Sequence, residues 1–550
     1  MNEIHNTQAL IRSVLSFLSQ TPWEPYCKAR LERLYDLSEM PCELAIAGKV
    51  KAGKSSFLNA LLGVDLAMVG TTETTATINY FKYGYPEDPD KPVIVYWNDG
   101  REPEAQTKEF LDSLQGYDKD VLERAIKIDH LEYLVPDKRL KHITLIDTPG
   151  FGSVEDVHEQ RTAGYFNPQL TDLRELHTRQ SDSLAEGADA VVYISTPVPE
   201  SSAQKFFGEY IPNISAINAI GVMTQIDREN NAGSEVINRM VKTLASSYRR
   251  ELSTVVPVSA GVYHAVKKLQ RQGTLAELQS KIRQIPKDEF NDYFDGDSQV
   301  FYDQDGDFNS YYESVGLSYD DRVIMVSDMQ WKVFYTIAVA LYYREIDDAV
   351  DYLIDYSGME KVNNILEKQF FSRSRAIRCS KIIKEVQKIL VYLKNVALPE
   401  LKSRCLYREV YLSVLNYAEG HFDKDMLTSF RCFVDNNILS SEKCDSFSAE
   451  LDTLLVKADE VKEGLTGQGH SSEGLHLLDK LAPMLRNNDE VEELEILFGK
   501  YPDKIISTDR AYLMQRQRFW NVRQQRIKSN RELSRLLALA YAMYGKLLNE

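Results

Sequence analysis

Residues 44–56 read Leu-Ala-Ile-Ala-Gly-Lys-Val-Lys-Ala-Gly-Lys-Ser-Ser. Gly48, Gly53, Lys54 and Ser55 have the G-x-x-x-x-G-K-[ST] spacing of a phosphate-binding loop. The four apolar residues at its start predict a buried strand, and the residues after Ser55 predict a helix. The stretch therefore predicts a strand–loop–helix unit that binds a nucleotide, although a strand–turn–helix corner can match this spacing by chance.

The chemistry of a triphosphate explains these residue types. Backbone N–H groups must approach the phosphates closely, and glycine permits the backbone conformations that a Cβ would hinder. The helix N-terminus adds positive partial charge. Lys54 would reach the β- and γ-phosphates, and the Ser55 hydroxyl would bind Mg²⁺. The expected phosphate contacts lie within one loop: Gly48, Lys51, Ala52, Gly53, Lys54, Ser55 and Ser56.

Length and charge limit the class of protein. The chain has 550 residues, enough for more than one domain, and a formal net charge of −17, which disfavours general affinity for nucleic acid. Its six cysteines are scattered without metal-ligand spacing, which favours reduced thiols in a cytosol. The start of the chain lacks the pattern of a signal peptide, and its longest apolar stretch is about half of the ~20 residues that span a bilayer.

A second motif follows an apolar strand at 143–146, where the sequence reads Asp147-Thr148-Pro149-Gly150. A carboxylate at a strand end beside the phosphate loop can hold the water shell of Mg²⁺. The Gly150 N–H can then contact the γ-phosphate. The motif alone is a common turn sequence, but its position after a phosphate loop favours the functional interpretation.

Two further motifs follow predicted strands and point to guanine. Residues 224–227 read Thr-Gln-Ile-Asp and resemble the [NT]-K-x-D motif, with Thr224 first and Asp227 last. The Asp227 carboxylate can accept hydrogen bonds from guanine N1–H and its 2-amino group, which adenine lacks. Gln225 replaces the usual Lys and can still cover the base. Residues 259–261 read Ser-Ala-Gly and resemble the S-A-K loop behind the base, which adds Ser259 and Ala260 to the site.

A threonine-rich segment at 70–78 lies between the phosphate loop and the second motif. A GTPase needs one threonine here to close over Mg²⁺ and the γ-phosphate. We predict that Thr75 serves this role, with Thr74 as the next choice. Thr-rich edge strands offer a structural alternative.

These motifs together resemble the dynamin superfamily of large GTPases and, within it, the bacterial dynamin-like proteins. The resemblance covers about 240 residues and implies GTP and GDP as ligands, Mg²⁺-dependent GTP hydrolysis, and movement of a helical stalk. It also implies a homodimer through the GTPase face, or a partner dynamin-like protein. A cytoplasmic protein with peripheral contact to an anionic membrane, acting in remodelling or secretion, fits the same resemblance.

The expected fold is an α/β P-loop GTPase domain with a mixed, mostly parallel sheet, joined to an elongated all-α helical bundle. The expected domains follow the chain: 1–40 as a helical segment of the neck, 41–285 as the GTPase domain, 286–322 as an acidic aromatic connector, and 323–550 as the helical neck and stalk with a bundle turn or tip near 464–474. Residues 108–127 within the GTPase domain have a helical pattern.

Two features depart from simpler GTPases. No Gln follows closely after the second motif, so the attacking water must be positioned otherwise. Lys51 stands where many dynamins have a Ser that helps to hold a monovalent cation. Its ammonium could supply that charge as a catalytic group beside Lys54 and Thr75, or it could point into solvent.

The rest of the chain supplies weaker signals. Residues 288–321 hold eleven acidic and nine aromatic residues but no Lys or Arg. An EF-hand loop starting at Asp303 would have Phe308 in place of Gly at its sixth position and Ser314 in place of Glu at its twelfth, so that interpretation fails. They predict a connector whose aromatic residues dock on a neighbouring domain, or partial disorder. Residues 331–343 favour a core helix over a membrane-dipping one, and the basic stretch 373–388 favours a solvated face over a lipid contact.

Two other functions fit the same residues. One is a GTP-controlled switch that binds a protein partner without membrane activity. The other is a scaffold that binds the nucleotide but hydrolyses it weakly or not at all.

Overall fold

The structure is a computed structural model. It describes the following residues: 2–49, 51–63, 77–114, 127–148, 188–198, 206–207, 218–228, 234–248, 251–294, 297–304, 306–327, 329–418, 424, 427–429, 431–432, 441–465, 474, 477–478, 481, 484–485, 488–499, 506–526 and 530–549. The chain divides into two compact units. One contains residues 42–373 and 468–550, and the other contains 1–41 and 374–467.

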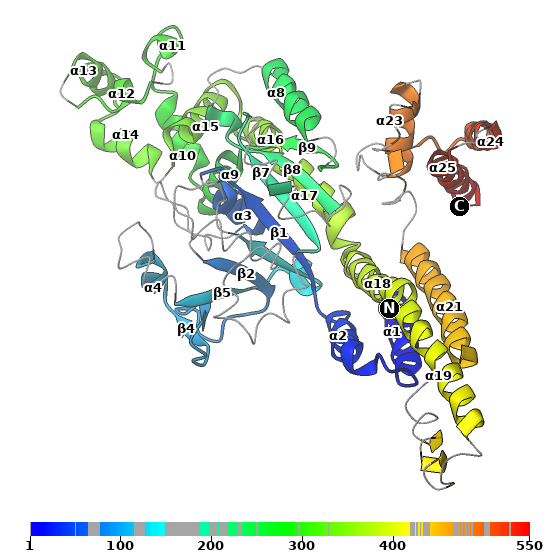
Figure 1. Ribbon diagram of the computed structural model, residues 1–550. Coiled ribbons are helices and arrows are strands. Elements are labelled where there is room, and N and C mark those ends of the chain that lie inside the picture. The colour runs from blue at the N-terminus through cyan, green and yellow to red at the C-terminus, as the bar shows by residue number, and fades with distance from the viewer. Residues whose placement is uncertain are drawn as a thin grey trace. The chain divides into compact units, whose positions relative to one another are not determined.

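A mixed sheet forms the centre of the first unit (Figure 1). Its order in the described residues is β4-β3-β5-β2-β6-β1-β7-β8-β9. The strands are β1 (Cys42–Gly48), β2 (Ile78–Tyr83), β3 (Val93–Trp97), β4 (Glu104–Gln106), β5 (Ile128–Val135), β6 (Ile143–Asp147), β7 (Ala190–Ser195), β8 (Ala219–Met223) and β9 (Val255–Pro257). Neighbouring strands from β6 through β9 are parallel, whereas β2 is antiparallel to β6 and β3 is antiparallel to both β4 and β5.

The strands in the parallel half of the sheet are buried on both faces. Every residue of β6, β7 and β8 is buried, as expected for strands that are covered on both faces. Helix α3 (Lys54–Leu62) leaves β1, and α9 (Ala260–Gln272) follows β9 and packs against α3. The mostly parallel sheet with flanking helices confirms the α/β part of the expected fold.

Helices after the sheet pack around an aromatic core in the same unit. They are α10 (Leu275–Ile282), α11 (Phe290–Tyr293), α12 (Ser298–Phe301), α13 (Asp307–Ser314), α14 (Tyr319–Val326), α15 (Trp331–Tyr343), α16 (Ile346–Ser357) and α17 (Met359–Leu366). Phe290, Phe301, Tyr312 and Phe334 are buried within one cluster. The expectation that α15 is a core helix is confirmed, because Phe334, Ile337 and Leu341 are fully buried.

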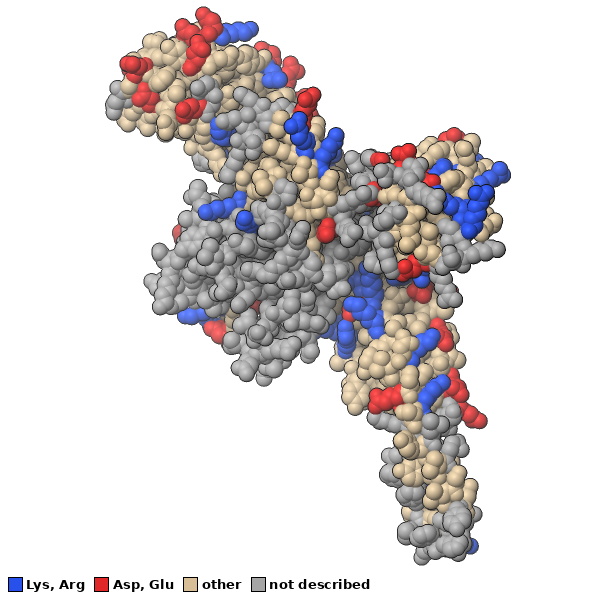
Figure 2. All heavy atoms as spheres, turned by 45° about the horizontal axis from the view of Figure 1, so that its top comes forward, with Lys and Arg blue, Asp and Glu red and all other residues tan. Residues whose placement is uncertain are grey.

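The acidic segment 288–321 contains the short helices α11, α12 and α13 and the start of α14. Its aromatic side chains pack inward, and acidic side chains gather over it at the upper left of Figure 2. Asp303 accepts hydrogen bonds from the N–H groups of Gly306, Phe308 and Asn309, so this carboxylate stabilises the start of α13.

Residues 108–127 contain a shorter described helix than their pattern predicts. The helix α4 spans Lys108–Asp112, and the segment 115–126 lies outside the described residues. Phe110 packs against Trp97 of β3, with ring centroids 6.4 Å apart.

The second unit is a helical bundle. It contains α1 (Asn2–Leu18), α2 (Glu24–Leu37), α18 (Ser374–Tyr392), α19 (Leu398–Ala418) and α21 (Ser441–Leu465). Apolar residues of α1 and α2 share one core with α18 and α21, although they are more than 330 positions apart in the chain. The basic stretch in α18 is partly used in this packing, because buried Arg378 donates to the Pro41 carbonyl at 2.6 Å.

The last residues form their own packed cluster of helices. They include α24 (Arg510–Arg526) and α25 (Arg531–Asn549), which pack together. Arg516 and Arg523 pair with Glu493 and Glu490 of α23 (Asn488–Leu497). These pairs explain part of the basic charge near the end of the chain. No described helix is both long and apolar enough to cross a bilayer.

Candidate nucleotide-binding site

The turn from β1 to α3 has the backbone that a phosphate loop requires. Gly53 has φ +89°, in the left-handed region, and directly precedes α3. A Cβ on Gly48 would lie 2.3 Å from the carbonyl oxygen of Ile194 on β7, so only glycine permits this strand spacing. Lys51 also has a positive φ, of 63°, which is costly for a residue with a Cβ.

Lys54 lies inside this loop. Its Nζ donates to the carbonyl oxygens of Gly48 and Lys49, each at 3.1 Å. Burial lowers the pKa of Lys54, and the nearby Asp147 carboxylate opposes that shift. The loop therefore holds a buried ammonium group where the sequence predicts the β- and γ-phosphates.

The parallel pairing of β6 with β1 places Asp147 beside the phosphate loop. It ends β6 and lies opposite Ile46 of β1. Its side chain is fully buried, and its Oδ1 atom has no hydrogen-bond partner among the described residues. Burial raises the pKa of Asp147 to about 6, whereas Lys54 and Asn79 act in the opposite direction.

These residues fit a magnesium ion. A buried carboxylate oxygen without a partner is costly, and it is a suitable acceptor for water bound to Mg²⁺. Ser55 is half-buried at the start of α3, next to Lys54. Ser55 would supply a hydroxyl ligand, and Asp147 would hold the water shell of the ion.

The sequence interpretation missed Asn79. This buried residue lies on β2 opposite Asp147, and its Nδ2 is 3.5 Å from Asp147 Oδ2. Thr77 Oγ1 donates to Asn79 Oδ1 at 3.2 Å and so orients the amide. An Asn within a predicted strand can indicate a functional residue, because Asn is otherwise depleted in strands.

The third motif contacts the phosphate loop directly. Thr224 Oγ1 donates to the Ala52 carbonyl at 2.5 Å, and Gln225 Nε2 donates to the Lys51 carbonyl at 2.7 Å. Gln225 has a positive φ of 61°. Gln225, which replaces the usual Lys, therefore ties the loop to the segment after β8.

The predicted base-reading residues lie at the ends of the next two strands. Asp227 is half-buried in the 3₁₀ turn Ile226–Arg228 after β8. Ser259 follows β9, and its Oγ accepts a hydrogen bond from the Val262 N–H at 3.3 Å, which caps α9. Ala260 is the first residue of α9 and is buried. Binding crevices in open α/β sheets lie at these carboxyl ends.

Some predicted residues cannot be placed. Thr74, Thr75 and Gly150 lie outside the described residues, and so does the whole segment 149–187. Ser56 is half-buried in the first turn of α3. The described part of the chain contains no cluster of three or more His, Cys, Asp or Glu residues suited to a metal ion.

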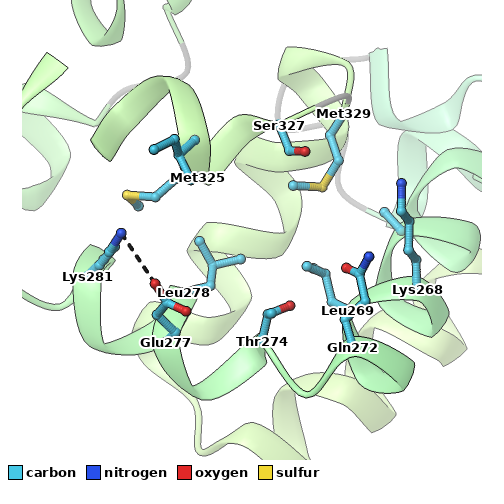
Figure 3. Close-up of a pocket in the computed structure, with 12 residues that line it drawn as sticks. Lys268, Leu269, Gln272, Thr274, Glu277, Leu278, Lys281, Met325, Ser327 and Met329 are labelled. Atoms are coloured by element: carbon cyan, nitrogen blue, oxygen red, sulfur yellow. Dashed lines mark ion pairs between the residues drawn. The ribbon is translucent and has the colours of Figure 1, made fainter. Parts of the chain in front are cut away.

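A separate cavity of about 260 Å³ lies between α9, α10 and the end of α14 (Figure 3). Lys281 and Glu277 form an ion pair beside it, and the Thr274 hydroxyl has no partner among the described residues. Leu269, Leu278 and Met325 add an apolar lining. None of the predicted nucleotide-binding residues lines this cavity, so it is not part of the candidate site.

These features define a P-loop GTPase domain. They are the phosphate loop, the buried Lys54 and Asp147, and the two motifs that follow β8 and β9. Comparison with known families gives the same class: residues 44–226 match the model described as "Dynamin family". These residues form a dynamin-family GTPase domain, as the resemblance implied.

Curated relatives match part of the chain. The isoniazid-induced protein IniC of Mycobacterium tuberculosis is 28% identical over 240 residues, which are 42% of this chain and 44% of IniC. A bacterial dynamin-like protein of Nostoc punctiforme is 30% identical over 133 residues, 22% of this chain and 18% of that protein. The chain thus spans less than half the length of these relatives.

A solved structure of an oligomerised bacterial dynamin pair also aligns with the chain. The alignment covers 86% of this chain and 90% of that chain at 12% identity. Its TM-score is 0.29, which is too low to support an argument about shared architecture.

Proposed function

We propose that this protein binds GTP and hydrolyses it to GDP and phosphate. The observation that carries the proposal is the juxtaposition of Lys54 and Asp147. A buried ammonium and a buried carboxylate lie at the end of two paired parallel strands, inside a glycine loop. In a Mg²⁺–triphosphate, the negative phosphates would neutralise the Lys54 ammonium, and the positive ion would neutralise the Asp147 carboxylate.

The residues divide the chemistry between them. The loop amides and Lys54 bind the phosphates and stabilise the charge that develops as water attacks the γ-phosphorus. Ser55 and Asp147 would hold Mg²⁺ and its waters, and Thr75 would complete that shell. The ion would supply electrostatic stabilisation of the β- and γ-phosphate oxygens. Gly150 would donate its N–H to the γ-phosphate.

Guanine selectivity comes from the residues after β8 and β9. Asp227 would accept hydrogen bonds from guanine N1–H and the 2-amino group, which adenine cannot provide. Thr224 and Gln225 hold the phosphate loop against this segment. Ser259 and Ala260 would lie behind the base at the start of α9.

We also propose that hydrolysis is coupled to movement of the helical unit in membrane-associated remodelling or secretion, with a homodimer through the GTPase face or a partner dynamin-like protein. The family of residues 44–226 supports this proposal. A GTP-controlled switch is the alternative. Co-sedimentation with anionic liposomes separates the two, because a switch should stay in the supernatant with and without GTP.

Calorimetry and phosphate release test the site. We expect GTP and GDP, but not ATP, to bind in millimolar Mg²⁺, and we expect turnover per molecule to rise with protein concentration if dimers are the active form. Lys54→Ala should abolish turnover, whereas Lys91→Ala, at an exposed lysine, should not. Turnover retained in pure Lys54→Ala protein would refute the site. Binding of GTP without phosphate release would favour the scaffold alternative.

A further inference from the structure

The turn between α16 and α17 lies against the end of β9. Gly358 has φ +67°, and a Cβ at this position would lie 2.2 Å from the Pro257 carbonyl oxygen. This oxygen belongs to the backbone, so a side chain at position 358 would have to displace either the turn or the strand end. Gly358 therefore permits an approach between these segments that no other residue would allow.

Hydrogen bonds join the same turn to the predicted base-side loop. The Ser259 N–H donates to the Ser357 carbonyl at 2.9 Å. On the other side, the Val258 N–H donates to the Met223 carbonyl of β8 at 2.7 Å. Residues 258–259 are thus held between β8 and the α16–α17 turn, and a shift of the turn would move the start of α9.

Helix α15 also packs against this loop. A Cβ on Gly261 would lie 2.8 Å from Cγ2 of Val333 in α15. Gly261 stands where the S-A-K motif has Lys. The packing of Val333 explains the glycine, because a larger residue would push α15 away from the loop.

Tyr356 packs beside the segment that carries Asp227. Its half-buried side chain contacts two apolar clusters, and one of them contains Ile226, the residue before Asp227. Burial raises the pKa of Tyr356, and the Asp227 carboxylate is near enough to raise it further. The phenol is protonated at neutral pH, as an unperturbed tyrosine is, and its hydroxyl can donate a hydrogen bond.

We propose that Tyr356, Ser357 and Gly358 form a specificity-determining turn, which positions Asp227 and the Ser259–Ala260 loop for recognition of a guanine base. The inference rests on the proposed GTP site. Gly358 and Ser357 fix the position of residues 258–259, and Tyr356 packs beside the segment whose Asp227 carboxylate would bind the base. All three lie outside the phosphate loop, at the end of α16, so they should act on base selectivity rather than on hydrolysis.

The experiment compares Gly358→Ala with a matched glycine. Gly273 has a similar φ of +71°, but a Cβ there would meet nothing within 4 Å. Both alanine variants therefore carry the same kind of backbone strain, and only Gly358→Ala forces the base-side loop to move. The measurements are dissociation constants for GTP, ATP and inosine triphosphate by calorimetry, together with kcat at saturating GTP.

We expect Gly358→Ala to weaken GTP binding by about tenfold or more, the cost of one misplaced hydrogen bond. The preference for GTP over ATP should shrink, and kcat should change little. Gly273→Ala should keep the wild-type preference. A Gly358→Ala protein with wild-type selectivity would overturn the inference, whereas wild-type protein that binds no guanine nucleotide would overturn the proposed function instead.

Tyr356→Phe provides a test that does not depend on tolerance of Gly358→Ala. It removes one hydroxyl and leaves the ring in place. Inosine lacks the 2-amino group of guanine, so the ratio of GTP to inosine triphosphate affinity reports on Asp227. We expect this ratio to fall several-fold in Tyr356→Phe and to stay unchanged in Tyr352→Phe, one turn earlier on α16. An unchanged ratio in both variants would count against the role of Tyr356.

An independent observation concerns the helical unit. Cys405 of α19 and Cys444 of α21 are buried, and their Sγ atoms are 3.0 Å apart. Lys402 pairs with Asp445 at 2.8 Å, and Lys394, just before α19, pairs with Asp452, so two ion pairs on one side of the thiols hold the two segments together. A disulfide needs a sulfur separation of about 2.05 Å, which requires a movement of about 1 Å.

We infer that Cys405 and Cys444 are a site of disulfide formation driven by a peroxide. One thiol attacks the peroxide and becomes a sulfenic acid, and one water leaves. The second thiol then displaces hydroxide from that sulfur, which forms the S–S bond and releases a second water. Two thiols are oxidised and one peroxide is reduced. Burial and Cys405 raise the pKa of Cys444 to about 12, so the reaction should be slow.

Peptide mapping without reductant tests this pair. After treatment of the full chain with hydrogen peroxide, we expect a 405–444 cross-linked peptide that is two hydrogens lighter than the two thiol peptides. We also expect the thermal midpoint of the helical unit to rise by several degrees. Cys405→Ala should lose both effects, and Cys432→Ala, at an exposed cysteine, should keep them. Cross-linking through any other pair, or no cross-link after prolonged treatment, would overturn the inference.

Discussion

Asn79 Nδ2 lies 3.5 Å from Asp147 Oδ2, across the antiparallel pair of β2 and β6. This amide and Lys54 are the groups that oppose the effect of burial on the pKa of Asp147. The candidate magnesium site therefore depends on a strand that runs against the parallel half of the sheet.

Asn79→Leu should weaken magnesium binding. Without the amide donor, the Asp147 carboxylate loses one group that favours its charged form. We expect the Mg²⁺ concentration for half-maximal nucleotide binding to rise several-fold, measured by titration with a fluorescent GTP analogue. Thr77→Val, which removes only the hydroxyl that orients Asn79, should have a smaller effect. An unchanged Mg²⁺ requirement in Asn79→Leu would show that the amide has no role at the ion.

The stability of the metal-free protein should fall as the pH rises through the range in which Asp147 ionises. Its pKa is raised from 3.8 to about 6 in the folded chain. Between these values the folded state keeps a proton that the unfolded chain has lost. The free energy of unfolding should therefore decrease from about pH 4 to pH 6, by roughly 3 kcal/mol in total.

Urea unfolding in EDTA at pH 4.5 and pH 7.5 measures about two thirds of this loss, with Asp147→Asn as the control. The variant has no group to titrate, so the difference between the two proteins isolates Asp147. Adding Mg²⁺ and GDP at pH 7.5 should restore stability to the wild type only. Parallel pH dependence in the two proteins would place the titration elsewhere.

Sequence patterns locate the parallel strands well, because buried strands leave short apolar runs. The run at 143–146 is β6, and those at 190–195 and 219–223 match β7 and β8. Glycine and lysine spacing also identifies the loop, because phosphate geometry dictates it. Contacts from distant segments leave no such pattern. Asn79 reaches Asp147 by strand pairing, and Gly358 meets Pro257 by helix packing.

Lys51→Ala should lower turnover by about tenfold or more, because a positive charge beside the γ-phosphate stabilises the transition state. The side chain is exposed, and its carbonyl accepts from Gln225, so the loop should survive the substitution. Lys51→Arg should retain most activity, and Lys51→Gly, which relieves the positive φ, should be as slow as Lys51→Ala. A wild-type requirement for K⁺ or Na⁺ would argue against this role.

Arg139 joins the end of α3 to α17. It donates to the Leu61 carbonyl at 2.7 Å and to Asn363 Oδ1 at 3.4 Å, and it pairs with Asp137. Arg139→Ala should lower the free energy of unfolding by about 1–3 kcal/mol, because the partly buried Leu61 carbonyl and the Asp137 carboxylate lose their donor.

Arg101→Ala is a matched control for Arg139→Ala. Arg101 also follows an aspartate by two residues, but its pair with Asp99 is exposed. Urea denaturation should show no clear change for this variant. Equal effects of the two substitutions would mean that the bonds of Arg139 to Leu61 and Asn363 contribute nothing.

Asp227→Asn should exchange guanine for xanthine. A carboxylate accepts from N1–H and the 2-amino group of guanine, whereas an amide presents a donor to one of these positions. One hydrogen bond is replaced by two opposed donors and the other loses its charge, so GTP binding should weaken by about 100-fold or more. Xanthine has a carbonyl at position 2, which accepts from the amide, so xanthosine triphosphate should bind the variant better than GTP does. Asp189→Asn, which alters a carboxylate that accepts from the Glu43 N–H, should not change the base preference. Equal losses of GTP and xanthosine triphosphate binding in Asp227→Asn would make Asp227 a structural residue of the turn after β8, and base recognition would have to come from the start of α9.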